Sequence, residues 1–261
     1  MLIAQQVQAY LATFNEQKCL NEEEVFLFGH GDEPVRGICV CWMASAPALA
    51  FAARQGCNLV VCHEAVTFYD YPVWIDRSPI KEPWPCDRVR LDLIEKHKLT
   101  VLRAHSTVDP THVGPALWES LQLPPPVFSG WAYSHHQIEP ASVADLAARM
   151  RQGLGLTHVR VTGNPARRIT QLGTAWGGVG LDRNMHMIIQ YLLPRGVEAV
   201  IVGETSDFAQ RMAMESDLAL LEGGHSPTED MGMRRVAEEL DQHFADTKVA
   251  FRPQEVPWAT L

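Results

Sequence analysis

Residues 58–68 read NLVVCHEAVTF, a short apolar run that ends on a histidine and a glutamate side by side. Residues 59–62 are apolar throughout and follow the turn residue Gly56, which predicts a strand buried on both faces, as in a parallel sheet. His63 and Glu64 would then lie at the carboxyl end of that strand. Ligands collect at this edge of open α/β sheets, because the loops that leave it converge on a crevice. Taken alone, the pair is explained equally well by a histidine that caps the strand beside a solvated glutamate.

The sequence before this strand completes a β-α-β unit. Residues 37–41, GICVC, predict another buried strand. Ser45 and Pro47 predict a helix start with serine at the N-cap and proline in the first turn, and this helix runs to about Gln55. Residues 30–64 therefore form one unit whose two strands are parallel with a right-handed crossover.

Histidines and acids also follow a second predicted strand. Residues 100–104 are a buried run that leads into His105 and Asp109. Another histidine, His30, lies in the glycine-punctuated loop 28–32, which we expect at a strand edge. For His105, a hydrogen bond to its own loop is at least as good an explanation as catalysis. His30 is the better candidate for an acid or base, because a glycine-rich loop leaves it room to move.

The last predicted strand, 218–221, leads into His225 and Glu229. The four residues from Ser226 to Glu229 also match a capping box at the start of a helix over 227–244, which explains the glutamate without any metal. His225 immediately precedes this box. The sequence therefore leaves two explanations open here, a helix cap and a pair of metal ligands.

The chain contains an internal repeat. Residues 56–64, GCNLVVCHE, match residues 196–204, GVEAVIVGE, so that Glu64 falls on Glu204 at an offset of 140. We interpret the match as a duplicated β-α-β unit. The predicted fold class is α/β, with two related α/β halves.

The proline run that starts after Leu123 suggests where the halves divide. We expect a first half over 1–122, a Pro-rich linker over 123–140 and a second half over 141–261 that is continuous with the first as one structural unit. His135 and His136 fall in the linker, and we interpret them as exposed loop residues outside the site.

Composition excludes several classes of function. The 261 residues carry a net charge of -9, which argues against a nucleic-acid partner or an anionic membrane surface. The six cysteines show no C-x-x-C spacing, as expected in a reducing compartment. No run approaches the ~18 apolar residues of a membrane span, and the N-terminus lacks the features of a signal peptide. We expect a cytoplasmic protein.

Residues 69–85 are rich in aromatic residues and prolines and follow neither a helical nor a strand pattern. Aromatic side chains are enriched in interface cores. We expect this segment to be covered by a neighbouring subunit or to wall a cleft, and the alternative is a lid folded onto its own domain.

Three predicted strand ends together supply a set of nitrogen and carboxylate donors. This mixture suits Zn, Fe or Mn rather than Ca. Five ligands exceed the three protein ligands of a tetrahedral catalytic zinc, so two metals that share a carboxylate fit the count better. The candidate metal ligands are His63, Glu64, Asp109, His225 and Glu229.

Five motifs occur in a characteristic order along the chain. They are CHEAVTF, AHSTVD, GGVGLD, GETSDF and GGHSPTE. In this order they resemble the NIF-three-like dinuclear metal-centre proteins, which are often named type 2 GTP cyclohydrolase I, and the resemblance extends over residues 28–239. It implies two α/β halves that face each other across a dinuclear metal cleft, two divalent metal ions as cofactors, and assembly into a toroidal homohexamer.

The resemblance also implies a role for each ligand. His63 and Asp109 would hold one metal ion, Glu64 and His225 the other, and Glu229 would bridge both.

The chain departs from the family pattern at two positions. Glu64 stands where the family has a second adjacent histidine, and Phe208 stands where it has a histidine beyond the Gly-Glu pair. The extra carboxylate raises the ligand charge from two negatives to three, so two divalent ions would carry a net charge of +1 instead of +2. A bound water would then be less acidified, which favours harder ions such as Mn or Fe, or weaker binding of the second ion.

The leading functional hypothesis is a metal-dependent hydrolase in which metal-activated water attacks a small polar or nucleotide-like substrate. His30 and His105 would act as acid or base or would position the metal ligands. The alternative is a non-catalytic metal-binding assembly for storage, delivery or sensing of metal, or an interaction scaffold. Whether the chain is an enzyme stays open at this point.

Overall fold

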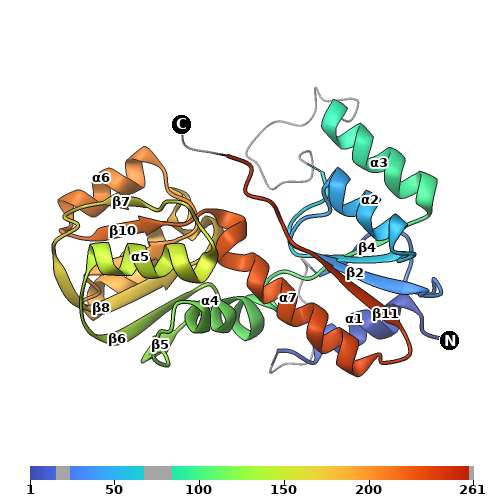
Figure 1. Cartoon of the computed structure of the whole chain (residues 1–261), viewed down its shortest axis with the longest axis horizontal. Coiled ribbons are helices and arrows are strands. Elements are labelled where there is room, and N and C mark those ends of the chain that lie inside the picture. Colours follow the sequence, from blue (N-terminus) through green and yellow to red (C-terminus); the bar gives the residue numbers. More distant parts are fainter. Residues whose placement is uncertain (16–23, 68–83, 259–261) are drawn as a thin grey trace. The chain divides into compact units, whose positions relative to one another are not determined.

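The computed structural model describes residues 1–15, 24–67 and 84–258, which form two compact units (Figure 1). The first unit comprises Met1–Thr111 and Met233–Gln254, and the second comprises His112–Gly232 and Glu255–Leu261. This division differs from the predicted halves. The chain crosses to the second unit eleven residues earlier than the predicted end of the first half at 122, and its C-terminal part returns to the first unit.

The first unit is a five-stranded sheet with helices on its faces. Its elements are α1 (Ala4–Ala12), β1 (Phe26–Phe28), β2 (Gly37–Cys41), α2 (Ala46–Arg54), β3 (Leu59–Cys62), α3 (Pro85–His97), β4 (Thr100–Arg103) and β11 (Lys248–Arg252). The strand order is β1-β4-β3-β2-β11, in which only β1 runs antiparallel to its neighbour. Every residue of β2 and β3 is buried, as their unbroken apolar sequences predict.

Local signals account for the β-α-β unit that was predicted around β3. The Ser45 side chain accepts a hydrogen bond from the backbone N–H of Ala48 at the start of α2, so the predicted N-cap is confirmed. Gly56 follows that helix with φ of 76°, a left-handed conformation that glycine adopts without steric cost. Strands β2 and β3 are parallel neighbours, as the crossover requires.

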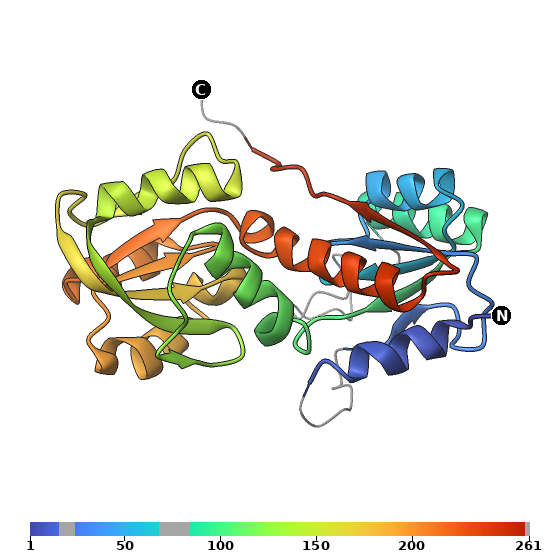
Figure 2. The ribbon, with the colours of Figure 1, turned by 60° about the horizontal axis from the view of Figure 1, so that its bottom comes forward.

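The first helix of the chain and the late segment Met233–Gln254 both belong to the first unit. Figure 2 shows α1 beside the last turns of α7 (His225–His243), where the Tyr10 ring stacks on His243 at a centroid distance of 3.6 Å. Strand β11 then pairs with the edge of β2. The sequence did not predict this strand, because β11 is only half-buried and has no strong apolar pattern.

The second unit is a six-stranded mixed sheet. Its elements are α4 (Gly114–Ser120), β5 (Phe128–Ser129), β6 (Tyr133–Ser142), α5 (Val143–Leu154), β7 (Arg160–Thr162), β8 (Arg168–Ala175), a 3-10 turn (Gly177–Gly180), a π-helical turn (Ile188–Leu192), a 3-10 turn (Leu193–Arg195), β9 (Ala199–Val202), α6 (Asp207–Glu215), β10 (Ala219–Glu222) and the start of α7. The strand order is β5-β6-β8-β9-β10-β7, and β8, β9 and β10 are parallel. A further π-helical turn, Asp109–Val113, joins the two units.

The predicted linker over 123–140 is the largest departure. Most of its second half belongs to β6, and His135 and His136 are buried in that strand rather than exposed in a loop. The ring of His136 accepts at Nε2 from the Ser134 hydroxyl, 2.6 Å away, and its Nδ1 donates to the carbonyl of Pro124 at 2.8 Å. These hydrogen bonds satisfy the buried ring of His136, which explains how this histidine can lie in a buried strand.

The internal repeat is visible in the backbone. Strand β9 lies 140 residues after β3 and has the same length, and Gly196 precedes it with φ of 74°, matching Gly56 at 76°. Short π and 3-10 turns precede β9. A proline inside a helix removes a hydrogen bond, and Pro194 lies in the second of these turns.

Two other predictions concern the segment 69–85 and membrane-spanning helices. Residues 69–83 of the expected lid or interface loop lie outside them, whereas Trp84 caps α3 and Pro85 is its first residue. Within 1–15, 24–67 and 84–258, no helix is both long enough and apolar enough to cross a membrane.

Candidate metal-binding groups

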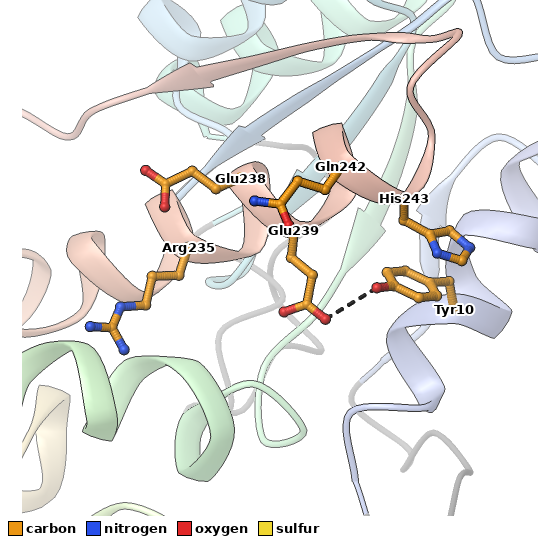
Figure 3. Close-up of a pocket in the computed structure, with 6 residues that line it drawn as sticks. All are labelled: Tyr10, Arg235, Glu238, Glu239, Gln242 and His243. Atoms are coloured by element: carbon orange, nitrogen blue, oxygen red, sulfur yellow. Dashed lines mark hydrogen bonds between the residues drawn. The ribbon is translucent and has the colours of Figure 1, made fainter.

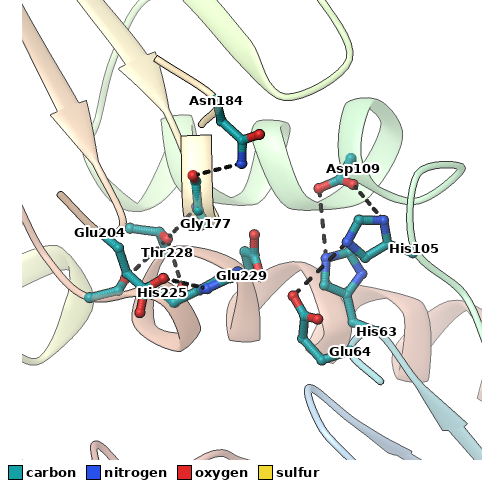
Figure 4. A network of polar contacts seen from close by, with 12 residues as sticks. His63, Glu64, His105, Asp109, Gly177, Asn184, Glu204, His225, Thr228 and Glu229 are labelled. Atoms are coloured by element: carbon teal, nitrogen blue, oxygen red, sulfur yellow. Dashed lines mark hydrogen bonds and ion pairs between the residues drawn. The ribbon is translucent and has the colours of Figure 1, made fainter. Parts of the chain in front are cut away.

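The first unit gathers four candidate residues at the carboxyl ends of two neighbouring strands. His63 and Glu64 follow β3, and His105 and Asp109 follow β4, which is parallel to β3. The carboxyl ends of parallel neighbours lie at the same edge of a sheet, so the topology brings these side chains together. We call His63, Glu64, His105 and Asp109 the first group (Figure 4).

The backbone of the first two members is fixed by hydrogen bonds. The N–H groups of His63 and Glu64 both donate to the carbonyl of Trp42, each at 2.9 Å. The guanidinium of Arg103 donates to the His63 carbonyl at 3.0 Å. The turn that carries both side chains is therefore held from two neighbouring strands.

The ring of His63 is fully buried, and its hydrogen bond determines the tautomer. Its Nδ1 lies 3.0 Å from the Ala104 carbonyl, which can only accept, so Nδ1 carries the proton. Nε2 then presents its lone pair toward Asp109, whose Oδ1 is 3.7 Å away. This distance is too long for a hydrogen bond. A hydrogen bond from one ring nitrogen to a backbone carbonyl is the usual arrangement of a histidine that binds a metal through the other nitrogen.

His105 lies against the same pair. Its ring stacks on His63 with centroids 4.4 Å apart. Its Nδ1 is 3.8 Å from Asp109 Oδ2, and its Nε2 is 4.0 Å from Glu64 Oε1. The sequence raised a simple hydrogen bond to its own loop as the alternative for His105. The structure places both ring nitrogens within 4.0 Å of carboxylate oxygens of the first group.

Glu24 supports the loop between His105 and Asp109 and was missed in the sequence. Its carboxylate is almost fully buried and accepts hydrogen bonds from the backbone N–H and the hydroxyl of Thr107. The residue lies 83 positions away from Thr107, so no local pattern connects the two. Because carboxylate acceptors make strong hydrogen bonds, we expect Glu24 to restrict the loop that presents both site residues.

The second unit supplies its own candidate pair at the start of α7. His225 Nε2 lies 3.2 Å from Glu229 Oε2, one helical turn on. On the other side of the ring, Nδ1 donates to Glu204 Oε2 at 3.0 Å. The capping box, one of the two explanations that the sequence left open, does not match the helix start, because α7 begins at His225 and Ser226 lies inside the helix. We call Glu204, His225 and Glu229 the second group (Figure 4).

A glycine makes room for the second group. Gly177 has φ of 58°, and a Cβ atom placed there would meet Glu229 Oε1 and His225 Nε2. Its backbone N–H donates to the hydroxyl of Thr228 at 3.1 Å. The glycine motif of the sequence is thus needed both for its left-handed backbone and for close approach to the two side chains.

His30 does not join either group. Strand β1 runs antiparallel to β4, so the loop after β1 lies at the amino end of β4. A Cβ atom at Gly29 would touch Thr100, the first residue of that strand. His30 is exposed at the edge opposite to His63 and His105, and its expected catalytic role has no support from this placement.

The donor chemistry of the first group fits a divalent cation of the Zn, Fe or Mn type. Ligand atoms from His63, His105 and Asp109 all lie within 4.8 Å of one another, and two of the three residues are buried. Every donor in this set is a nitrogen or an oxygen atom. This set matches the ligand preference of those ions better than that of Ca or of soft metals.

A hollow on the first unit is lined by residues outside the first group. Figure 3 shows it along one face of α7, where the Tyr10 hydroxyl donates to Glu239 at 3.1 Å. Its other lining residues are Arg235, Glu238, Gln242 and His243. Spacing of three and four places them on the solvent side of an amphipathic helix, which is an ordinary location for charged residues.

Comparison with known proteins finds a family model and named relatives that match this chain. A family model described as Duf34/NIF3 (NGG1p interacting factor 3) matches residues 24–256. A Neisseria meningitidis serogroup B protein named GTP cyclohydrolase 1 type 2 homolog is 25% identical over 224 residues, which are 82% of each chain. A Pseudomonas aeruginosa protein of the same name is 32% identical over 108 residues, or 41% of this chain and 39% of that protein.

Solved structures share the fold at low identity. One described as protein ybgI of unknown function has a TM-score of 0.80 at 21% identity, covering 98% of this chain and 100% of its own. A Bacillus cereus protein related to NIF3 has a TM-score of 0.78 at 12% identity, covering 100% and 99%. These similarities confirm the α/β fold of both units.

Proposed function

The chain belongs to the Duf34/NIF3 family, and from this premise we propose that it is a metal-dependent hydrolase whose two divalent ions are bound by the first and second groups. The observation that carries the proposal is the convergence of His63, His105 and Asp109 within 4.8 Å of one another at a buried sheet edge. The substrate we propose is a small polar or nucleotide-like molecule.

Burial gives the first group its affinity for a cation. Asp109 is 2% exposed, and a carboxylate that is removed from water requires a compensating positive charge or hydrogen bonds. The hydrogen bond of His63 Nδ1 to the Ala104 carbonyl places the proton of the neutral ring on Nδ1, so that Nε2 is the nitrogen with the lone pair. A divalent cation supplies charge to Asp109 and accepts the lone pair of His63 at once.

When bound, such ions polarise a substrate oxygen and lower the pKa of water, which is the chemistry that hydrolysis requires. The chain itself would contribute proton handling. His105 is 17% exposed, so solvent reaches a ring that lies beside both Glu64 and Asp109. An imidazole in this position could pass a proton to a leaving group.

Two substitutions in the family pattern favour a second candidate, a non-catalytic protein that stores, delivers or senses metal. Glu64 adds a negative charge to the first group, which lowers the acidity of metal-activated water. Phe208 is 74% exposed on α6 and offers no donor atom. Both substitutions would change the metal site rather than the fold.

Metal analysis tests the proposal directly. Protein purified without chelators or an affinity tag should contain divalent metal, and Asp109→Ala should lose most of it. Asp92→Ala, which removes an exposed carboxylate on α3, is the matched control and should retain its metal. If the wild-type chain is isolated and reconstituted without binding any divalent metal, the proposal fails.

Turnover then separates the two candidates. A panel of nucleotides, phosphoesters and cyclic amides would be assayed with the metal-loaded protein, the Asp109→Ala variant and the Asp92→Ala control. Hydrolysis that disappears only in Asp109→Ala supports the enzyme. Metal binding with no turnover on any substrate of the panel favours the storage or sensing role.

A further inference from the structure

We propose that the second unit binds a short extended peptide that carries an acidic side chain, and that this peptide pairs as an added strand with the free edge of β6. The place is a hollow of about 800 Å³ within the second unit. Its lining comes from the segment before β5, from the middle of β6 and from α5. The inference goes beyond the proposed function, because no residue of either metal-binding group lines this hollow.

Strand β6 is long, and its neighbour on one side is short. Strand β5 pairs only with Ser134 and His135, whereas β8 pairs with β6 from Tyr133 to Ser142. Among the residues that the structure describes, β6 beyond His135 therefore has no strand on the side away from β8. An edge of this kind presents backbone N–H and C=O groups that can pair with another chain.

The backbone of Gln137 faces this free side. The Tyr133 carbonyl accepts a hydrogen bond from the N–H of Gly130 at 2.8 Å, and the His135 carbonyl accepts one from Val127 at 2.8 Å, so both carbonyls point toward β5. Alternate residues of a strand direct their backbone groups to the same side, and the register with β8 is regular as far as Gln137. The N–H and C=O of Gln137 therefore also point away from β8.

The sequence before β5 keeps this edge free. Extending the register between β5 and β6 by two residues would place Pro126 opposite Gln137. Pro124 and Pro125 precede it, and a proline has no N–H to donate to the Gln137 carbonyl. The Pro124 carbonyl instead accepts from the ring of His136 at 2.8 Å. This segment therefore cannot continue the ladder, whereas a separate strand with N–H groups can.

The size of the edge limits its occupant to a short segment. The register between β6 and β8 shifts between Gln137 and Ala141, and a bulge of this kind bends a strand and interrupts regular pairing. The volume of the hollow, about 800 Å³, lies in the range of roughly 300–1,000 Å³ that is typical of ligand sites. A few extended residues fit such a place, and main-chain hydrogen bonds would provide most of their affinity.

Arg149 determines the kind of side chain that the peptide should carry. It is half-buried on α5 at the hollow, and its guanidinium has no hydrogen-bond or ion-pair partner in the described part of the chain. Asp145, one turn earlier, uses its carboxylate to accept from the N–H and hydroxyl of Ser142. A guanidinium in this state matches a carboxylate, which it can bind through two parallel hydrogen bonds.

Binding of synthetic peptides to the full-length chain tests the inference. The probe is a seven-residue peptide, acetyl-TVTDTVT-amide, and calorimetric titration measures its affinity. Two peptides are matched to it, one with lysine in place of aspartate and one with methyl groups on alternate backbone nitrogens. The lysine peptide should bind at least 10-fold more weakly. The methylated peptide should not bind, because it cannot donate hydrogen bonds to the strand edge.

Two variants of the chain locate the site. Gln137→Pro removes the outward N–H and leaves the pairing with β8, so it should fold and lose at least 10-fold in affinity for the aspartate peptide, whereas Gln137→Thr should bind as the wild type does. Arg149→Gln should abolish the preference for aspartate over lysine. Arg151→Gln, which removes an exposed arginine from the same helix, is the matched control and should keep that preference.

The outcomes decide the inference without reference to metal. Failure of the aspartate peptide to bind, or equal binding of all three peptides, overturns it. Self-association of the wild-type chain that Gln137→Pro abolishes would make a second copy the occupant of the edge, and would equally overturn it. Circular dichroism checks folding, and the methylated peptide decides the role of the strand edge if Gln137→Pro unfolds. Chelator-treated protein should bind the aspartate peptide with unchanged affinity.

Discussion

Replacing Gly177 with alanine should damage the second group more than the fold. The residue has φ of 58°, and a non-glycine residue in the left-handed region costs about 1–2 kcal/mol. Alanine also restricts the unfolded chain, which offsets about 0.4–1 kcal/mol of this cost. The net loss from backbone strain is therefore about 1 kcal/mol, or roughly 2–4 °C in Tm for a chain of this size.

The larger effect should fall on the site. The added Cβ would collide with Glu229 Oε1 and would lie 2.9 Å from His225 Nε2, so both side chains must rotate away. Under the proposed function, these are the two donors that the second group would offer to a metal ion. Because the displacement removes two ligands from their positions, we expect a loss of at least 100-fold in the affinity for the second ion, with only the small change in Tm.

Gly178→Ala is the matched control for this variant. Gly178 has no left-handed φ, and a Cβ atom there would meet nothing closer than 3.5 Å. Its Tm and metal affinity should stay close to wild type. The assay pairs calorimetry of the metal-free proteins with a chelator competition that counts bound ions. Equal metal affinity in Gly177→Ala and Gly178→Ala would show that the glycine does not make room for ligands.

Two other predictions follow from the structure and a third from the family resemblance. Glu204→Gln should weaken metal binding by about 10-fold at unchanged Tm, because it alters the partner of His225 Nδ1 but not Nε2, and isothermal titration against the exposed control Glu215→Gln measures this. Burial lowers the pKa of His136 below its ordinary value of 6.5, so the unfolded chain binds the proton more readily and stability should fall as the pH drops below about 6.5. Denaturant unfolding between pH 5 and 8 should show a weaker pH dependence in His136→Phe, and an identical profile would contradict the assignment. Finally, we propose a homohexamer, so light scattering at micromolar concentration should give six times the chain mass, and a monomer would refute it.

The sequence was sufficient for the elements whose signals are local. Strands β2 and β3 were predicted at their observed bounds because their residues are apolar without interruption and the neighbouring turns are marked by Ser45 and Gly56. The positions of His63 and Glu64 at a carboxyl end followed from those bounds. A parallel neighbour then placed His105 and Asp109 beside them, since strands that share a direction also share an edge.

The sequence did not predict features that depend on contacts between residues far apart in the chain. The polar residues of β6 predicted a loop. In the structure, hydrogen bonds to Ser134 and to the remote carbonyl of Pro124 satisfy His136, and the local sequence pattern does not reveal the second of these partners. Glu24 contacts Thr107 across 83 residues, and β11 joins β2 across more than 200. Periodicity describes neighbours within one element, so it carries no information about such pairs.

Glu204 is a site residue that the sequence could have predicted. The repeat aligned it with Glu64, and the structure places each of these glutamates beside a histidine of its own unit. The repeat is broken one residue earlier, where His63 aligns with Gly203. A side chain at Gly203 would collide with the backbone of Gly177, the same glycine that leaves room for the second group. The second unit therefore cannot accommodate the extra histidine without displacing Gly177, and this constraint explains why two copies of one strand end have come to carry different sets of donors.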